Sequence, residues 1–371
     1  MSKRTSPLIA FFVLMSLILA YQSAAAQGDS EPAGADATAA APVPISQFLL
    51  QFDLPGTPTN LTVEAPGRVW ATLPGIDAIG VISVTGATNQ TVTAYITRTY
   101  QLAAGSQPYN LTTHGGYVWF TAYAGNWVGR LEPVTGAIDA YPIPQANSGP
   151  TGIDVAPDGV VWFAMRDANR LGKLQPITGA IESYTYTLSA GGLEEVATVN
   201  PNAIWVTAPN VNRLVGFDPV MPEFINVPTL PYTRPVGLAV DADAIPWVSI
   251  QGSNHIGRYA PGTLALWRWT QLPPDSSVTS GPQQIALASG VGQWQLFYAN
   301  AAAQSIGRAH IAIDTAVGAI RPLKLGSICA PLDVAAEDSG RGWFACGSAN
   351  TVILWQPPYS VDAYLPLITK Q

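Results

Sequence analysis

The sequence predicts an all-β, seven-bladed β-propeller made of four-stranded antiparallel blades. Three observations predict this fold: a unit of about 45 residues recurs along the chain, an aromatic residue marks the same place in seven copies, and the composition favours strands and tight turns. Only 11% of the residues are charged, and the chain holds 34 Gly and 32 Pro. Such a composition suits short strands joined by tight turns.

The repeat is clearest in residues 107–141 (QPYNLTTHGGYVWFTAYAGNWVGRLEPVTGAIDAY) and 149–184 (GPTGIDVAPDGVVWFAMRDANRLGKLQPITGAIESY). An aromatic anchor recurs every 42 to 50 residues, at Trp70, Trp119, Trp162, Trp205, Trp247, Phe297 and Trp343. A proline precedes the anchor at Pro58, Pro108, Pro150, Pro235 and Pro331, with Leu193 in the fourth unit and Pro282 in the sixth. An amide or acid follows it, at Asp77, Asn126, Asn169, Asn212, Asn254, Gln304 and Asn350.

Each unit is expected to form four strands, A to D, with strand A innermost. In the third unit the expected strands cover 152–156, 160–165, 170–174 and 181–185, separated by turns such as Pro157-Asp158-Gly159. The anchor lies in strand B, so we expect it to pack between blades. A row of Trp residues for stacking sugars is the alternative.

The N-terminus has the features of an export signal. Lys3 and Arg4 precede an apolar stretch at 8–20, and small residues favour cleavage after Ala26. The prediction is a signal peptide at 1–26, a flexible acidic Ala/Pro linker at 27–44 and a propeller at 45–371 of a secreted, extracytoplasmic protein. No membrane span is expected after cleavage, and an uncleaved anchor is the alternative.

Two segments compete for the outer edge of blade seven. Residues 47–54 (QFLLQFDL) are favoured, and residues 361–365 (VDAYL) are the alternative. The two cysteines, Cys329 and Cys346, lie nearly opposite each other across the predicted hairpin of strands A and B in this blade. In an oxidising compartment we expect them to form a disulfide, with free or metal-binding thiols as the alternative.

The residue after each upstream proline is expected to line one mouth of the central channel. These residues are Thr59, Tyr109, Thr151, Glu194, Val236, Gln283 and Leu332. Arg234 precedes Pro235 and could add a cation beside them. Glu194 and Glu195 form an acidic pair, and partial burial would raise the pKa of one of them. A solvated pair is the alternative.

The loops between strands B and C are expected to open on the same face as the mouth. Trp127, Arg170, Arg213 and His255 share one repeat offset there, and Tyr123 and Arg166 lie nearby. This rim of aromatic and cationic side chains could bind a carbohydrate or an anion. Alternatively, the same side chains cover the turn backbone.

Charge and motifs exclude several functions. The net charge of −7, without a basic cluster, argues against a nucleic-acid partner. No two of the three histidines have metal-ligand spacing, so we expect no metal site. No cofactor motif is present, and Mg²⁺ or Ca²⁺ would be needed only by an enzyme. We expect a monomer.

The phrases SGPTGIDVAPDGVVWFAM, NRLGKLQPITGAIESY and NWVGRLEPVTGAIDAYPIP resemble repeats of the virginiamycin B (streptogramin) lyase family, and more loosely NHL and SMP-30-type propellers. The resemblance implies elimination at the ester of a cyclic depsipeptide with Mg²⁺. In that family two His follow the prolines of adjacent late blades, and a Glu precedes the second proline. Here Arg234-Pro235-Val236, Gly281-Pro282-Gln283 and Ala330-Pro331-Leu332 lack those residues.

The favoured function is therefore a secreted propeller that binds a small molecule, glycan or protein at the channel mouth. The alternative is a carbon–oxygen lyase or a lactonase-like hydrolase acting at the same mouth. A structural role in the cell envelope is the third hypothesis.

Overall fold

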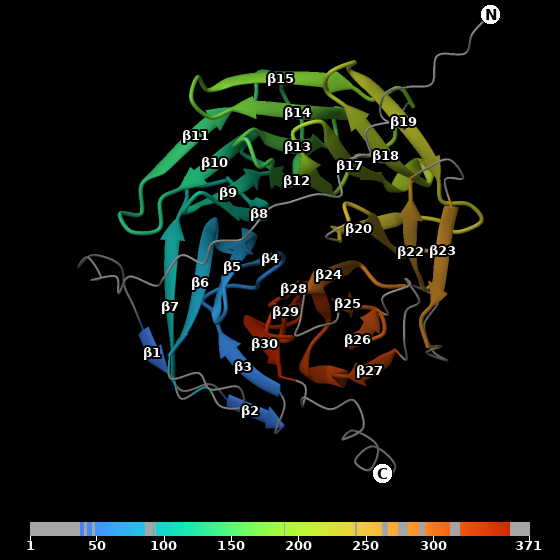
Figure 1. The fold of residues 1–371 in the computed structure, drawn as a ribbon. Coiled ribbons are helices and arrows are strands. Elements are labelled where there is room, and N and C mark those ends of the chain that lie inside the picture. Colours follow the sequence, from blue (N-terminus) through green and yellow to red (C-terminus); the bar gives the residue numbers. More distant parts are fainter. Residues whose placement is uncertain are drawn as a thin grey trace, which may run out of the picture.

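Seven antiparallel sheets surround a central channel in the computed structural model, which confirms the predicted propeller (Figure 1). The structure describes residues 38–40, 43–46, 49–85, 92, 94–188, 190–241, 243–261, 266–273, 281–288, 294–311 and 320–356. Within these ranges there is no α-helix, and three short 3₁₀ segments cover Pro74–Ile76, Pro209–Val211 and Gly326–Ile328. No helix in the described part of the chain is long and apolar enough to cross a membrane.

The strands of each blade follow one another from the channel outward. Blades 1 and 2 contain β4 (Leu61–Ala65), β5 (Arg68–Leu73), β6 (Ala78–Thr85) and β7 (Ala94–Gln101), then β8 (Pro108–His114), β9 (Tyr117–Ala122), β10 (Trp127–Leu131) and β11 (Ile138–Pro142). Blades 3 and 4 contain β12 (Pro150–Val155), β13 (Val161–Met165), β14 (Arg170–Gln175) and β15 (Ala180–Thr185), then β16 (Val196–Asn200), β17 (Ala203–Ala208), β18 (Arg213–Asp218) and β19 (Glu223–Pro228).

Blades 5 to 7 complete the ring. Blades 5 and 6 contain β20 (Pro235–Val240), β21 (Pro246–Ile250), β22 (His255–Ala260) and β23 (Leu266–Gln271), then β24 (Gln284–Ala288), β25 (Trp294–Asn300), β26 (Ser305–Ile311) and β27 (Arg321–Lys324). Blade 7 contains β28 (Pro331–Ala336), β29 (Gly342–Cys346) and β30 (Thr351–Trp355). Each innermost strand contacts the innermost strands of both neighbouring blades, including β28 and β4, so the ring is closed.

An N-terminal strand closes the ring, as the favoured alternative predicts. Strand β3 (Leu49–Asp53) pairs antiparallel with β30 as the fourth strand of blade 7, and β3 and β30 lie side by side in Figure 1. The competing segment 361–365 lies outside the described residues, as does the predicted signal peptide 1–26.

The predicted linker 27–44 includes residues that the structure places in strands. Strand β1 (Thr38–Ala40) pairs with β7, and β2 (Val43–Ser46) pairs with β3. Low hydrophobicity led to the linker prediction, but backbone pairing to an open sheet edge needs no apolar side chain. Residues 27–37 and 41–42 lie outside the described residues.

The aromatic anchors form the core between blades. Their exposed fractions do not exceed 4% at any of the seven positions, which confirms the core interpretation. Trp162 of blade 3 contacts Phe217 of blade 4, with ring centroids 5.7 Å apart. Burying one such indole stabilises the fold by about 4–6 kcal/mol as an upper bound.

The amide or acid after each anchor occupies a left-handed turn in six blades. Asn126 has φ 58°, a conformation that Asn tolerates better than most residues. Its side chain donates to the carbonyls of Ile143 and Gln145 and accepts from the Ser148 amide. The repeated amide thus holds the connection from strand D to the next blade, rather than only its own turn.

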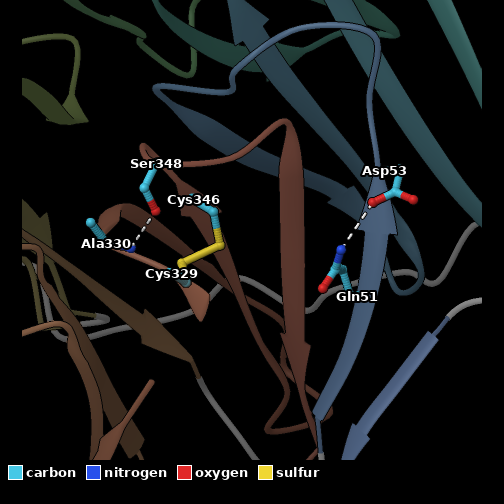
Figure 2. The surroundings of a disulfide bond; sticks show 6 residues. All are labelled: Gln51, Asp53, Cys329, Ala330, Cys346 and Ser348. Carbon is cyan, nitrogen blue, oxygen red and sulfur yellow. Dashed lines mark hydrogen bonds between the residues drawn. A yellow bond between two sulfur atoms is a disulfide. The ribbon is translucent and has the colours of Figure 1, made fainter. Parts of the chain in front are cut away.

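The predicted disulfide is present in blade 7, where β28 begins and β29 ends. Cys329 and Cys346 are joined across the β28–β29 hairpin, with their Cα atoms 5.1 Å apart (Figure 2). The Ala330 amide donates to the Ser348 hydroxyl beside the bridge, at 3.1 Å. The covalent bridge therefore joins the two inner strands of the blade that the N-terminal strand completes.

Candidate functional site

A cavity of about 470 Å³ lies at one mouth of the channel. Every blade contributes to its lining: Thr59, Asn60, Tyr109, Arg166, Gly192, Glu194, Glu195, Pro209, Asn210, Arg234, Val236, Gln251, Gln283, Gln284 and Leu332. Sites for drug-sized ligands have volumes of about 300–1,000 Å³, so the cavity is large enough for such a molecule. Six of the seven post-proline residues predicted at the mouth line it.

Consecutive residues reach the cavity at the start of strand A, which a regular strand would not allow. The pairs Thr59–Asn60, Glu194–Glu195 and Gln283–Gln284 all line it. Side chains of a regular strand alternate between faces. Five of these six residues instead precede their strand, and Gln284 is the first residue of β24, so the alternation does not yet apply to them. Of the second residues, only Glu195 was predicted from the sequence to belong to the site.

Strand-B hydroxyl groups fix the geometry of these starts. The Thr207 hydroxyl accepts from the Glu195 amide and donates to the Val236 carbonyl of the next blade, both at 3.0 Å. Ser249 does the same between Gly237 and Gln283. The hydroxyl lies two residues after the anchor in four blades, at Thr72, Thr121, Thr207 and Ser249. These bonds lock the lining residues of neighbouring blades together.

Glu194 lies in a partly buried ionic cluster, and its carboxylate is paired instead of being free in solvent. Its carboxylate accepts two hydrogen bonds from Arg166, at 2.9 and 3.0 Å, and one from the Tyr109 hydroxyl. The guanidinium also lies over the rings of Tyr109 and Tyr123. Burial by itself would lower the pKa of Arg166, but Glu194, Tyr123 and Tyr109 together outweigh burial and raise it. Burial and the neighbouring carboxylate raise the pKa of Tyr109.

Glu195 spans the channel at the floor of the cavity. It accepts from Asn110 of blade 2 at 2.8 Å and from Gln284 of blade 6 at 2.7 Å. The residue is 9% exposed, and burial, followed by the charges of Asp333 and Glu194, raises its pKa well above the ordinary value. The predicted pKa effect of a buried pair therefore falls on Glu195.

Asp333 of blade 7 is a second buried carboxylic acid in the inner strands. It follows Leu332, just as Glu195 follows Glu194, and it is 5% exposed. The amide of Leu61 donates to its Oδ2 at 2.5 Å, which links blade 7 to blade 1. Burial raises its pKa to about 7. Neither Asp333 nor Glu195 therefore has the acidity of an ordinary surface carboxyl group.

The wall formed by blades 5 and 6 carries a cation and amides. Arg234 is exposed, lines the cavity and donates from Nε to Gln251 Oε1 at 3.1 Å. The Oε1 atom of Gln283 is buried and has no hydrogen-bond partner among the described residues. The placement of Arg234 and Gln283 at the mouth agrees with the sequence prediction.

Thr151 does not line the cavity, although the sequence predicts that it does. It is fully buried, and its hydroxyl donates to the carbonyls of Leu193 and Glu194 at 3.2 and 3.0 Å. Blade 3 has Ala164 where four other blades have the strand-B hydroxyl, and Thr151 supplies an inter-blade bond there. It is a structural residue.

Of the six residues in the predicted rim of aromatic and cationic side chains, Arg166 alone lines the cavity. Trp127, Arg170, Arg213 and His255 each begin strand C, and none of the four lines the cavity. Arg170 bonds to Ser183, Arg213 bonds to the carbonyls of its own turn, Trp127 packs on Phe120, and His255 stacks on Tyr232. These contacts agree with the alternative, in which such side chains cover the turn backbone.

A sequence model of the virginiamycin B lyase family matches residues 51–268, more than half of the chain. The chain belongs to this family. A comparison with curated proteins found no match.

Solved structures agree with the fold of a virginiamycin B lyase family member. Selenomethionine-substituted virginiamycin B lyase from Staphylococcus aureus is 24% identical, with a TM-score of 0.68 over 82% of this chain and 98% of that chain. A streptogramin B lyase is 23% identical, with a TM-score of 0.69 over 83% and 96% of the two chains. A catalytically inactive histidine-to-alanine variant of the S. aureus enzyme, solved with quinupristin, is also 24% identical. These likenesses establish the fold alone.

The residues present do not fit the Mg²⁺ that the family implies. Mg²⁺ favours carboxylates that are free to coordinate it with near-ideal octahedral geometry. Here the carboxylate of Glu194 is paired with Arg166, and that of Glu195 accepts hydrogen bonds from two amide side chains. Among the described residues, no group of three or more His, Cys, Asp or Glu side chains is arranged to hold a metal ion.

Proposed function

We propose that this chain is an exported binding protein that holds a small polar molecule in the channel-mouth cavity and does not open streptogramins. The observation that carries the proposal is the identity of the late-blade mouth residues. Where the family resemblance implies histidines after the prolines, this chain has Val236, Gln283 and Leu332, all of which line the cavity. None of these side chains can exchange a proton near neutral pH.

The remaining acids of the cavity support the same proposal. Elimination needs a base at the α-carbon and an acid at the leaving oxygen. Glu194 is neutralised by Arg166, and Glu195 is buried and held by two amides across the channel. Paired and satisfied groups of this kind suit a preorganised binding site better than proton transfer.

Export of the protein rests on two further observations. A disulfide persists in oxidising compartments and is rare in reducing ones. The extracellular domain of a putative two-component system from B. thetaiotaomicron, 12% identical, has the same fold with a TM-score of 0.60 over 86% of this chain and 43% of that chain. The cysteine pair and the predicted signal peptide favour the same location.

The catalytic half of the proposal is tested by incubating the purified chain with a streptogramin B and Mg²⁺. Mass spectrometry should find no linear product above a protein-free control. A set of simple lactones with Ca²⁺ covers the hydrolase alternative. Turnover that disappears in Glu194→Gln would contradict the proposal and favour an enzyme.

The binding half is tested by thermal-shift screening of small polar molecules. The effect of compounds that raise the melting temperature of the wild type should change in Glu194→Gln, because this substitution breaks the Arg166 ion pair in the lining. Glu182→Gln makes the same substitution at an exposed site in β15 and should leave the effect unchanged. If the compounds raise the melting temperature of Glu194→Gln as much as that of the wild type, they do not bind in the cavity.

A further inference from the structure

Resting on the proposed function, we propose that the ligand is an acidic sugar, whose carboxylate binds Arg234 and whose hydroxyl groups bind the amides of the cavity. The juxtaposition that carries this inference lies on the wall of blades 5 and 6. Arg234, Gln251 and Gln283 line the same cavity there, with Asn210 contributed by blade 4.

The charges of the cavity leave a single cation for a ligand. Arg166 is paired with Glu194 at 2.9 Å, so these two residues cancel, and Glu195 is held by two amides in a buried place that favours its neutral form. Among the described residues Arg234 has no carboxylate partner, and its side-chain hydrogen bond to Gln251 uses Nε. Its two terminal nitrogens can therefore meet a carboxylate through two parallel hydrogen bonds. Arg234 is therefore a cation without a carboxylate partner in the cavity lining of a protein whose net charge is −7. Such a cation favours an anionic ligand at this place.

The backbone of Arg234 is held in a conformation that suits glycine. Its φ is 60°, and the equivalent positions in blades 3 and 4 are Gly149 and Gly192, with φ 57° and 59°. An Arg in the left-handed region costs about 1–3 kcal/mol, and such strain clusters at binding and catalytic sites. The Arg234 amide donates to Asn212 Oδ1 at 2.9 Å, which fixes this conformation. The side chain thus extends from a rigid turn.

The rest of the lining matches a polyhydroxylated molecule. Five amide side chains line the cavity, and each offers both donors and acceptors: Asn60, Asn210, Gln251, Gln283 and Gln284. The Oε1 atom of Gln283 is buried without a partner, and a buried acceptor of this kind needs a donor such as a hydroxyl. Val236, Leu332 and Pro209 provide apolar surface for the C–H faces of a sugar ring.

Matched probes separate the carboxylate from the sugar. Digalacturonate and galactobiose are both disaccharides rich in hydroxyl groups. Digalacturonate carries carboxylates, and galactobiose is neutral. Isothermal titration calorimetry should show digalacturonate binding at least about tenfold more tightly, because hydrogen bonds to a charged group contribute about 1.5–3 kcal/mol. The preference should fall with added salt.

The variant Arg234→Gly tests the residue without harming the fold. It removes the cation and relieves the left-handed strain, so its melting temperature should be no lower than that of the wild type. Its affinity for digalacturonate should fall to that for galactobiose. The matched control is Gln107→Gly, because Gln107 also precedes a proline with φ 46° and donates its amide to Asp77 Oδ1 at 2.8 Å, but does not line the cavity.

The outcomes distinguish this inference from the function on which it rests. Equal binding of both sugars would overturn the acidic-ligand assignment and leave the binding function standing. Binding of neither sugar, or binding of digalacturonate unchanged by Arg234→Gly, would overturn the inference. In those cases the thermal-shift screen with Glu194→Gln still decides whether the cavity binds another polar molecule. Loss of binding in Gln107→Gly as well would show a general effect of the turn and would also overturn the assignment.

Discussion

Replacing Asp333 with Asn should stabilise the protein at neutral and alkaline pH. The carboxyl group is 5% exposed, and burial raises its pKa from an ordinary value near 3.8 to about 7. Between these pH values the unfolded chain releases the proton and the folded chain keeps it. The stability that this group contributes is therefore complete below about pH 3.8 and is lost as the pH rises through about 7.

The size of the effect follows from the difference in pKa. Each pKa unit corresponds to about 1.36 kcal/mol, so the wild type should lose up to about 4 kcal/mol relative to Asp333→Asn across this interval. The Asn side chain keeps an oxygen that can accept from the Leu61 amide, so the link between blades 7 and 1 survives. The raised pKa of Glu195 gives a loss of the same sign, and removing Asp333 reduces it.

Urea denaturation followed by tryptophan fluorescence measures this difference at several pH values from about 4 to about 8. The free energy of unfolding of the variant should gain on that of the wild type as the pH rises. Asp158→Asn removes an exposed turn carboxylate and should give a curve parallel to that of the wild type. Parallel curves for Asp333→Asn, or a wild type that gains stability relative to it with pH, would refute the argument.

Substitutions at two further places, Thr207 and the disulfide, test the links that hold the ring together. Thr207→Val keeps the shape of a fully buried side chain but leaves the Glu195 amide and the Val236 carbonyl unpaired, so it should lower the free energy of unfolding by about 1–3 kcal/mol, whereas Thr207→Ser should cost less. Equal losses for Val and Ser would show that the hydroxyl is unimportant. Replacing both Cys329 and Cys346 with Ser opens a loop with a sequence separation of 17 and should cost about 3 kcal/mol in denaturant titrations. A double variant as stable as the wild type would mean that the bridge constrains the unfolded chain little.

The repeat predicted the ring because the core of a propeller is local and periodic. Trp119 and Trp162 lie at the same offset in strand B, and both are buried between blades. The N-terminal closure and the cysteine pair were also predictable, since both follow from the order of strands within a blade.

The cavity was only half predictable from the same repeat. The residues after the prolines point to the mouth, and Glu195 was predicted beside Glu194, but Asn60 and Gln284 were missed. A polar residue lies two positions after the proline, or after Leu193, in five of the seven blades, and that pattern was the available signal. The partners were not predictable, because Glu195 meets Asn110 and Gln284 across the channel, 85 and 89 residues away.

The repeat offset did not predict which rim residues reach the cavity. It placed Trp127 and Arg170 at the start of strand C, but neither side chain lines the cavity. Arg170 bonds to Ser183 of the neighbouring strand in its own blade, so its position in the repeat serves the blade and not the channel. Offsets predict which strand a residue occupies, but they do not predict its contacts.

A crystallographic screen with small polar fragments tests the central claim, that the channel-mouth cavity is a ligand site. The screen should pair carboxylates with their neutral amide counterparts. We expect fragments to collect in the cavity, with the carboxylates against Arg234 and donors against Gln283 Oε1. Fragments that bind elsewhere on the protein and leave the cavity without a ligand would contradict the claim.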